Sequence, residues 1–182
     1  SQEGLYRHFK LIAEATELPI MLYSIPGRCA IAIEVDTVAR LAASCPNIRA
    51  IKEAGGNAER VSQLRAALPE SFEILSGDDS LTLPFMSLGA CGVVSVASNL
   101  IPKVMVDLVA AANEGRYGDA LAIHRQYYPL FSAFLKLDTN PVPIKAALSL
   151  KGLCAPDLRL PMVSMPEEKL AELKGILDSL GL

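Results

Sequence analysis

The stretch Arg49-Ala50-Ile51-Lys52-Glu53-Ala54 decides the fold, because it places a lysine inside a short apolar run. The run begins at Ile48, after a turn at Cys45-Pro46-Asn47, and is typical of a parallel strand buried on both faces. Burial disfavours the ammonium form of a lysine and makes the amine nucleophilic near neutral pH. Such an amine can form a Schiff base with a carbonyl compound. On the strand alone, the simpler interpretation is a Lys52 that marks the strand's end and extends into solvent.

A second buried strand is expected upstream, over Leu18 to Ile25, where Pro26-Gly27 ends it. Tyr23 lies near its carboxyl end, and Arg28 falls in the loop beyond. A tyrosine in a strand is usually a core or interface residue, but a phenol beside an amine can relay the protons that imine formation requires. An arginine after Pro-Gly is usually solvated, although its planar group of donors suits a carboxylate.

The rest of the chain alternates between strands and helices, with a period of about 25 residues that indicates βα units and a parallel sheet. Further strands are expected over 72–79 and 92–96, and helices over 3–17, 35–43, 57–68 and 80–88. Asn57 and Asp79 are expected to be N-caps. From Pro102 onward the pattern is helical, with helices over 103–114, 117–137, 141–151 and 166–180. We expect one domain over 1–115 and a helical domain over 116–182.

Four motifs in this order resemble the dihydrodipicolinate synthase family. They are Tyr23-x-x-Pro26-x-Arg28, Ile51-Lys52-Glu53-Ala54, Ser76-Gly77-Asp78-Asp79 and Gly92-Val93-Val94-Ser95-Val96. The resemblance covers essentially the whole chain. It implies the second half of a (β/α)8 barrel, about four βα units, followed by a C-terminal helical extension. A complete barrel needs about 250 residues, so the 182 residues here correspond to the later part of the family pattern.

The resemblance also implies a reaction and roles for single residues. Lys52 would condense with pyruvate, Tyr23 would relay protons, and Arg28 would bind the carboxylate of the aldehyde substrate, aspartate semialdehyde. The sialic acid lyase branch of this superfamily generally lacks an arginine at that position. Gly77 would let substrate approach the strand backbone, and Val94 would pack against the pyruvate methyl group, although ordinary core packing explains Val94 equally well. The reaction implies no organic cofactor and no metal.

Composition excludes several other classes of protein. The hydrophobic content is 51% and the net charge is -3, with no cluster of basic residues that would suggest nucleic acid binding. No apolar run reaches the ~20 residues that span a membrane. The four cysteines, at positions 29, 45, 91 and 154, have neither zinc-site spacing nor an accompanying export signal. We therefore expect reduced thiols in a cytoplasmic protein. Asp78, Asp79 and Glu53 suggest a cation site, but adjacent strand residues point to opposite faces, so no metal is assigned.

Two alternatives to this function remain open. Another pyruvate-dependent aldolase of the same superfamily would share the lysine chemistry and use a different aldehyde. A catalytically incomplete fragment could instead serve as an assembly domain. In either case the outer strands of a half-barrel are unpaired apolar edges, which favour association. We therefore expect a homo-oligomer, or pairing with the missing half of the barrel.

Overall fold

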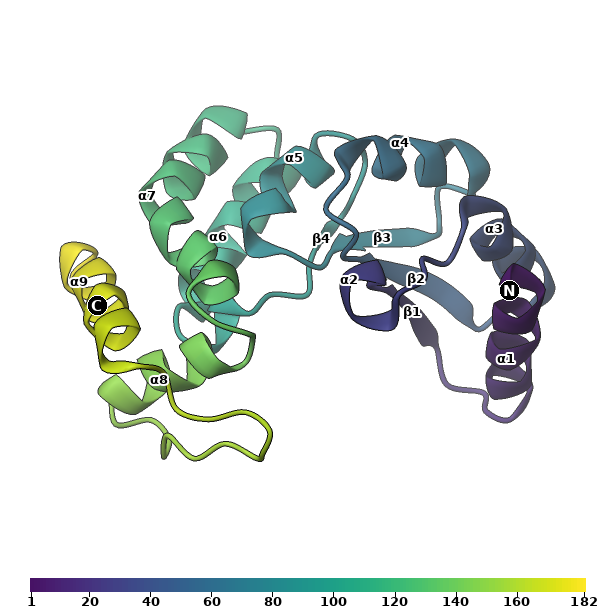
Figure 1. Cartoon of the computed structure of the whole chain (residues 1–182). Helices are drawn as coiled ribbons and strands as arrows, with labels where there is room; N and C mark the ends of the chain where they lie inside the picture. Colours follow the sequence, from purple (N-terminus) through teal and green to yellow (C-terminus); the bar gives the residue numbers. More distant parts are fainter. The chain divides into compact units, whose positions relative to one another are not determined.

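The computed structural model describes all residues from 1 to 182. They form two compact units, Ser1–Val94 and Ser95–Leu182. The first contains the whole sheet with its helices, and the second is helical (Figure 1). The expected boundary after residue 115 placed helix α6 (Pro102–Asn113) with the barrel, whereas here α6 packs along α7 (Tyr117–Lys136) in the second unit. The boundary after residue 115 refers to a closed barrel and stays a prediction.

A four-stranded parallel sheet forms the centre of the first unit, with strand order β1-β2-β3-β4. The strands are β1 (Ile20–Ser24), β2 (Ile48–Glu53), β3 (Glu73–Ser76) and β4 (Gly92–Val93). The helices are α1 (Gln2–Glu14), α2 (Pro26–Cys29), α3 (Val35–Ser44), α4 (Ala58–Ala67) and α5 (Thr82–Met86), with a 3₁₀ turn η1 (Asp79–Leu81). The predicted alternation of strands and helices is therefore confirmed. The last strand is shorter than predicted, since it ends at Val93 and not at Val96.

The two faces of the sheet are buried to different extents. Leu22, Ile51 and Ile74 point to one face and are almost completely buried; α3 contacts β2, and α4 and α5 contact β3. On the other face Met21 and Tyr23 are 45% and 44% exposed, and Lys52 is half-buried. The prediction of strands buried on both faces is thus wrong for this chain, because the helices of the first unit cover one face.

The N-cap of α4 was predicted correctly, but that of the following helix was not. Asn57 accepts a hydrogen bond from the Glu59 amide at 3.0 Å, as an N-cap should. Asp79 instead begins the η1 turn and is 1% exposed. Ser76 organises this turn, since its Oγ donates to the Asp78 carbonyl (2.8 Å) and accepts from the Asp78 amide (3.2 Å). A serine at the strand end therefore fixes the backbone that enters this turn.

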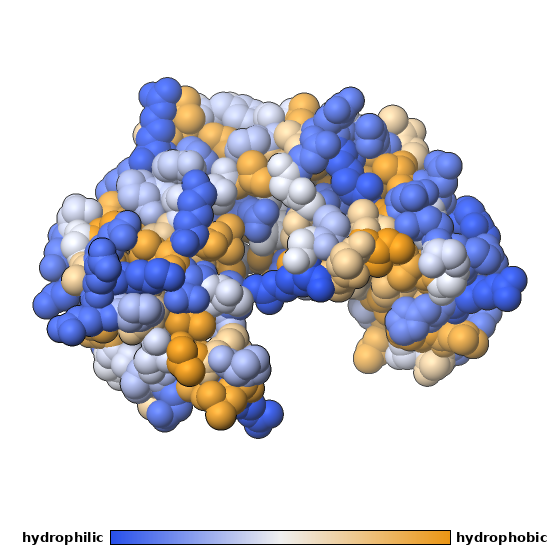
Figure 2. Space-filling model, in the orientation of Figure 1, coloured by the Kyte–Doolittle hydropathy of each residue, from blue (hydrophilic) through white to orange (hydrophobic).

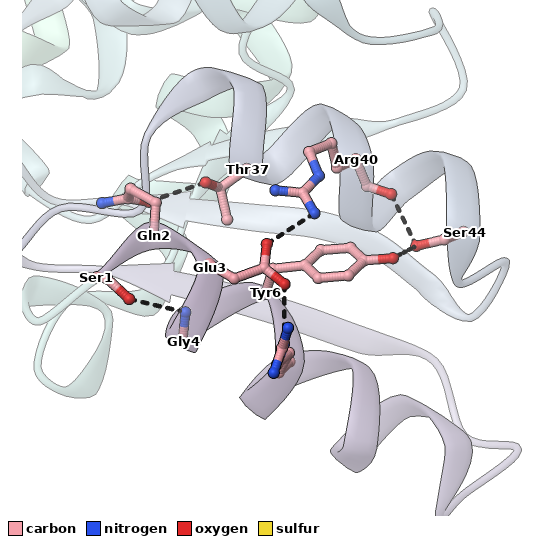
Figure 3. Close-up of polar contacts among 9 residues, drawn as sticks. Ser1, Gln2, Glu3, Gly4, Tyr6, Thr37, Arg40 and Ser44 are labelled. Atoms are coloured by element: carbon pink, nitrogen blue, oxygen red, sulfur yellow. Dashed lines mark hydrogen bonds and ion pairs between the residues drawn. The ribbon is translucent and has the colours of Figure 1, made fainter.

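Helix α1 is fixed to α3 by polar side chains (Figure 3). Glu3 pairs with Arg40 at 3.0 Å, and the Arg40 guanidinium lies 4.1 Å from the centroid of the Tyr6 ring. Gln2 accepts a hydrogen bond from Thr37 at 2.9 Å. Ion pairs at such exposed positions contribute little individually, typically ~0.2–1 kcal/mol. Their arrangement nevertheless fixes the start of α1 beside the start of α3.

The second unit consists of η2 (Ala97–Asn99), α6, α7, α8 (Val142–Leu150) and α9 (Glu167–Ser179). All four predicted helices are present, with ends within two residues of those expected. Leu130, Phe131 and Phe134 of α7, together with Leu173 of α9, are fully buried and form much of its core. None of the chain's helices is both long and apolar enough to span a membrane. Hydrophobic residues reach the visible surface at several separate places among a larger hydrophilic area (Figure 2).

Candidate active site

Tyr23 and Lys52 are direct neighbours in the sheet. They are paired in the register of β1 and β2, so their side chains leave the same face. The Lys52 Nζ lies 4.0 Å from the centroid of the Tyr23 ring, which is within the range of a cation–π contact. Both residues stand at the carboxyl ends of their strands, one position before the last. This is the edge at which parallel α/β folds place their ligands.

The strand ends continue this arrangement across β3 and β4. The amide of Gly77 donates to the Glu53 carbonyl at 2.7 Å, and the amide of Val94 donates to the Ser76 carbonyl at 2.8 Å. Gly77 and Val94 therefore follow the strand ends at the same edge as Lys52. Gly77 is buried and Val94 is half-buried. The fold thus brings four of the five predicted site residues to one edge of the sheet.

Gly77 has a packing role that the sequence does not reveal. A Cβ atom at this position would lie 2.4 Å from the Ala54 Cβ and 3.1 Å from the Glu53 carbonyl oxygen. Real atoms do not approach so closely, so only glycine fits here without a shift of the backbone. The close approach of the chain after β2 and β3 is a sufficient reason for this glycine, and its contact with substrate stays a prediction.

Arg28 was predicted in a loop, but it lies in the short helix α2, which begins at Pro26. Proline is favoured at the first helical position because it has no amide hydrogen to leave unpaired and its φ is already helical. The helix ends at Cys29 and is capped by Ala30, whose φ of 56° is left-handed. Arg28 is exposed, and the helix that carries it begins two residues after the last residue of β1. Its carboxylate-binding role stays a prediction.

A row of buried polar residues lies one position beyond Tyr23 and Lys52. Ser24, Glu53 and Ser76 are neighbours in the sheet register, and each is no more than 1% exposed. The Glu53 carboxylate accepts from Arg60 Nε at 2.6 Å and from the Gly55 amide at 2.8 Å. Arg60 was not identified from the sequence. The available signal was the run of polar residues that end three successive strands, which implies buried partners on the helix-covered face.

Asp78 adds negative charge close to this row. Burial raises the pKa of its carboxyl group, and the charges of Asp79 and Glu53 add to the rise, whereas Lys52 opposes it. No group of three or more histidine, cysteine, aspartate or glutamate side chains is placed to hold a metal ion. The arrangement is therefore a lysine amine beside a tyrosine ring, with carboxylates at neighbouring positions.

Comparison with known proteins assigns this arrangement to a family. The model of the dihydrodipicolinate synthetase family matches residues 1–180. The 4-hydroxy-tetrahydrodipicolinate synthase of Desulforamulus reducens is 50% identical over the whole chain, which covers 61% of that relative. The structure of the synthase from Methylacidiphilum fumariolicum SolV superimposes with a TM-score of 0.98 at 53% identity, covering 100% of this chain and 60% of that one. A structure described as the first monomeric dihydrodipicolinate synthase variant has a TM-score of 0.95 at 38% identity and is covered to 61%.

These matches extend over the full chain, but the chain spans about three fifths of the length of the relatives. The four βα units are accordingly part of a (β/α)8 barrel, as the motifs predicted. Both the order of the motifs and their places at the strand ends agree with the family assignment. The chain belongs to the dihydrodipicolinate synthetase family.

Proposed function

We propose that this chain, together with the strands that close its sheet, is a lyase that condenses pyruvate with aspartate semialdehyde through a Schiff base on Lys52. We call this assembly the complete barrel. The observation that carries the proposal is the position of the Lys52 Nζ, 4.0 Å from the centroid of the Tyr23 ring at the carboxyl edge of a parallel sheet. The product would enter lysine and diaminopimelate biosynthesis, as the names of the relatives suggest.

The proposed reaction begins when the Lys52 amine attacks the pyruvate carbonyl carbon and gives a carbinolamine. Loss of water, with a proton supplied to the leaving hydroxyl, leaves a protonated imine. This imine withdraws electrons, so a methyl proton is removed and an enamine forms. The enamine carbon attacks the aldehyde carbon, and the aldehyde oxygen takes up a proton. Water then releases the product and regenerates the amine.

Three other residues have proposed roles in these steps. The Tyr23 hydroxyl would carry protons to and from the carbinolamine, since its ring already lies against the amine. Arg28 would bind the carboxylate of the semialdehyde with two parallel hydrogen bonds. Val94 would pack against the pyruvate methyl group. Gly77 keeps the chain after β3 close to Ala54, which shapes the same edge.

The proposal includes self-association of the chain. β1 and β4 are the outer strands of the sheet, and each has one edge without a partner strand in this sheet. One relative is described as the first monomeric variant of its kind, which supports oligomers among the others. We propose a homo-oligomer of the complete barrel. A reducing cytoplasm as its location stays a prediction.

Covalent trapping tests the function directly. The complete barrel is incubated with pyruvate and borohydride, which reduces an imine to a stable secondary amine, and the modified peptide is located by mass spectrometry. We expect one modification, at Lys52, and none in a Lys52→Arg variant. Labelling of another lysine, or no labelling of the unaltered protein, would refute the mechanism.

Two alternative functions are separated by the same assay. A different pyruvate-dependent aldolase would label at Lys52 but turn over another aldehyde, so a panel of aldehydes with and without a carboxylate distinguishes it. A second candidate is a catalytically incomplete assembly domain, which the partnerless outer edges of β1 and β4 in this sheet would favour. Such a domain would bind its partner but would not label with pyruvate.

A further inference from the structure

The Arg60 side chain is bonded to two separate segments of the candidate site. Its Nε donates to Glu53 Oε2 at 2.6 Å, and a terminal nitrogen donates to the Ile33 carbonyl. The two side chains of the pair are 15% and 0% exposed. A guanidinium is planar and holds two acceptors at fixed relative positions. We call the three groups (the Glu53 carboxylate, the Arg60 guanidinium and the Ile33 carbonyl) the Arg60 bridge.

The two ends of the Arg60 bridge belong to the segments that carry Lys52 and Arg28. Glu53 is the residue after Lys52 and ends β2. Ile33 closes the segment that leaves β1 at Ser24, because its amide donates to Ser24 Oγ at 3.3 Å. Arg28 lies in the middle of this segment. We call residues 25–34, which include Arg28, the Arg28 segment. Arg60 therefore connects the end of the Arg28 segment to β2, the strand that carries Lys52.

The start of the Arg28 segment is also close to the Arg60 bridge. Glu53 Oε1 accepts from the Gly55 amide at 2.8 Å. A Cβ atom built on Gly55 would lie 2.6 Å from that oxygen and 3.7 Å from the ring of Pro26, the first residue of α2. The Glu53 carboxylate thus bonds to Gly55, which lies beside Pro26 at the start of the Arg28 segment. Arg60 bonds to Ile33, near the end of the same segment.

The two segments depend on Arg60 to different degrees. β2 is an inner strand with ladder partners on both sides, so the Lys52 backbone is held without the bridge. The segment 25–34 contains one helix of four residues, and its later part is held by side chains. Besides Ser24 and Arg60, Gln2 of α1 donates to the Ala32 carbonyl (2.9 Å) and accepts from the Glu34 amide (3.0 Å). Loss of Arg60 should displace Arg28 more than Lys52.

We infer that Arg60 is a positioning residue, which holds Arg28 at the distance from Lys52 that the carboxylate of the aldehyde requires. This inference rests on the proposed function for the identity of the aldehyde, but its structural part does not. It predicts that changes at Arg60 impair recognition of the carboxylated aldehyde and spare imine formation with pyruvate.

Arg60→Lys is the variant that separates positioning from charge. A lysine keeps a positive charge beside the buried Glu53 carboxylate, but a single ammonium group cannot hold both acceptors as the guanidinium does. The matched control is Arg65→Lys on the same helix. Arg65 also donates to backbone carbonyls, those of Phe72 (2.9 Å) and Pro69, but these precede β3 at the opposite end of the strands.

Two measurements on the complete barrel test the inference. In Arg60→Lys we expect the KM for aspartate semialdehyde to rise about tenfold or more, with the rate of pyruvate imine formation within about threefold of the unaltered protein. Hydrogen exchange should become faster in residues 25–34 and stay unchanged in β2. Arg65→Lys should leave the aldehyde KM and the exchange of 25–34 unaltered, even if it lowers the melting temperature.

Each possible result counts for or against the inference. An unchanged aldehyde KM in Arg60→Lys, or an equal rise in Arg65→Lys, overturns it. Unchanged exchange in 25–34 overturns it as well, and this readout needs no enzymatic activity. Failure of the unaltered protein to label at Lys52 would refute the proposed function instead, while the exchange result would still decide whether Arg60 holds the Arg28 segment.

Discussion

The Lys52 Nζ lies over the ring of Tyr23, 4.0 Å from its centroid, and the two residues are register partners on adjacent parallel strands. This relationship follows directly from the sheet, because paired positions on neighbouring strands present their side chains to the same face. The contact joins an amine to a phenol at the strand ends, so the contributions of the ring and of the hydroxyl of Tyr23 can be tested separately.

Replacement of Tyr23 by phenylalanine tests the hydroxyl alone. The ring contact with Lys52 is retained, while the group that would move protons is lost. Proton transfer by a positioned side chain typically contributes about 10²–10⁴-fold, so we expect turnover to fall within this range. The rate of pyruvate imine formation, followed by borohydride trapping, should fall with it.

A Tyr23→Leu variant serves as the comparison, because it removes the ring as well. If the hydroxyl is the functional group, both variants should lose turnover to a similar extent. If Tyr23→Phe keeps full activity and Tyr23→Leu does not, Tyr23 acts through packing and the proton relay is excluded.

Arg28→Ala should impair the second substrate and spare the first. Loss of a charge-assisted, bidentate contact typically costs about 1.5–3 kcal/mol, which corresponds to roughly ten- to a hundred-fold in kcat/KM for the carboxylated aldehyde. Imine formation with pyruvate should change little. Steady-state kinetics and trapping, measured on the same protein, compare the two steps. An equal loss in both would show that Arg28 acts through the structure of α2.

The sequence was sufficient for the order of elements and for the residues at the strand ends. Tyr23 was expected near the end of one strand and Lys52 in the next strand of the chain, and the register of β1 and β2 confirms that they are neighbours. The N-cap at Asn57 was also predicted, because such caps depend on local sequence. The features that were predicted correctly are thus mostly local.

The features that were missed depend on contacts between distant residues. The Arg60–Glu53 pair spans seven positions and requires the packing of α4 on the sheet, which no local pattern encodes. Gly77 was attributed to substrate access because its neighbour Ala54, which follows the end of β2, is distant in the sequence and is not revealed by a linear pattern. The exposed face with Met21 and Tyr23 was missed because an apolar run does not show which faces are covered.

Asp78→Asn should stabilise the protein at neutral pH but not in acid. Burial, followed by the charge of Asp79, raises the pKa of Asp78 above the 3.8 of an ordinary aspartate. At pH values between the unfolded-state pKa and the raised folded-state pKa, the folded protein binds more protons than the unfolded protein. The stability of the unaltered protein therefore falls as pH rises through this range. Asparagine does not titrate and avoids this loss. The melting temperature of the variant should therefore exceed that of the unaltered complete barrel, by a difference that grows as pH rises from 3.

Asp36→Asn is the control for this comparison, since Asp36 is an exposed residue in the first turn of α3. Its carboxylate interacts favourably with the helix N-terminus, so its loss should cost a few tenths of a kcal/mol, in the opposite direction. A destabilising effect of Asp78→Asn at neutral pH would contradict the prediction and indicate a hydrogen bond that needs the carboxylate.

Gly77→Ala should destabilise the protein, chiefly because the Ala54 Cβ would lie 2.4 Å from the added methyl group. Overpacking of this kind typically costs about 1–3 kcal/mol, which we expect to measure in denaturant unfolding of the complete barrel. Gly27→Ala is the matched control, because no atom lies within 4 Å of a Cβ built there.

Adding Ala54→Gly to Gly77→Ala removes the closest contact but leaves the Ala54 Cα at 3.0 Å and the Glu53 carbonyl at 3.1 Å. We expect Gly77→Ala to lower pyruvate labelling at Lys52 as well as stability. The double variant should therefore regain part of both. Recovered stability without labelling would show that Gly77 is needed for substrate as well as for packing.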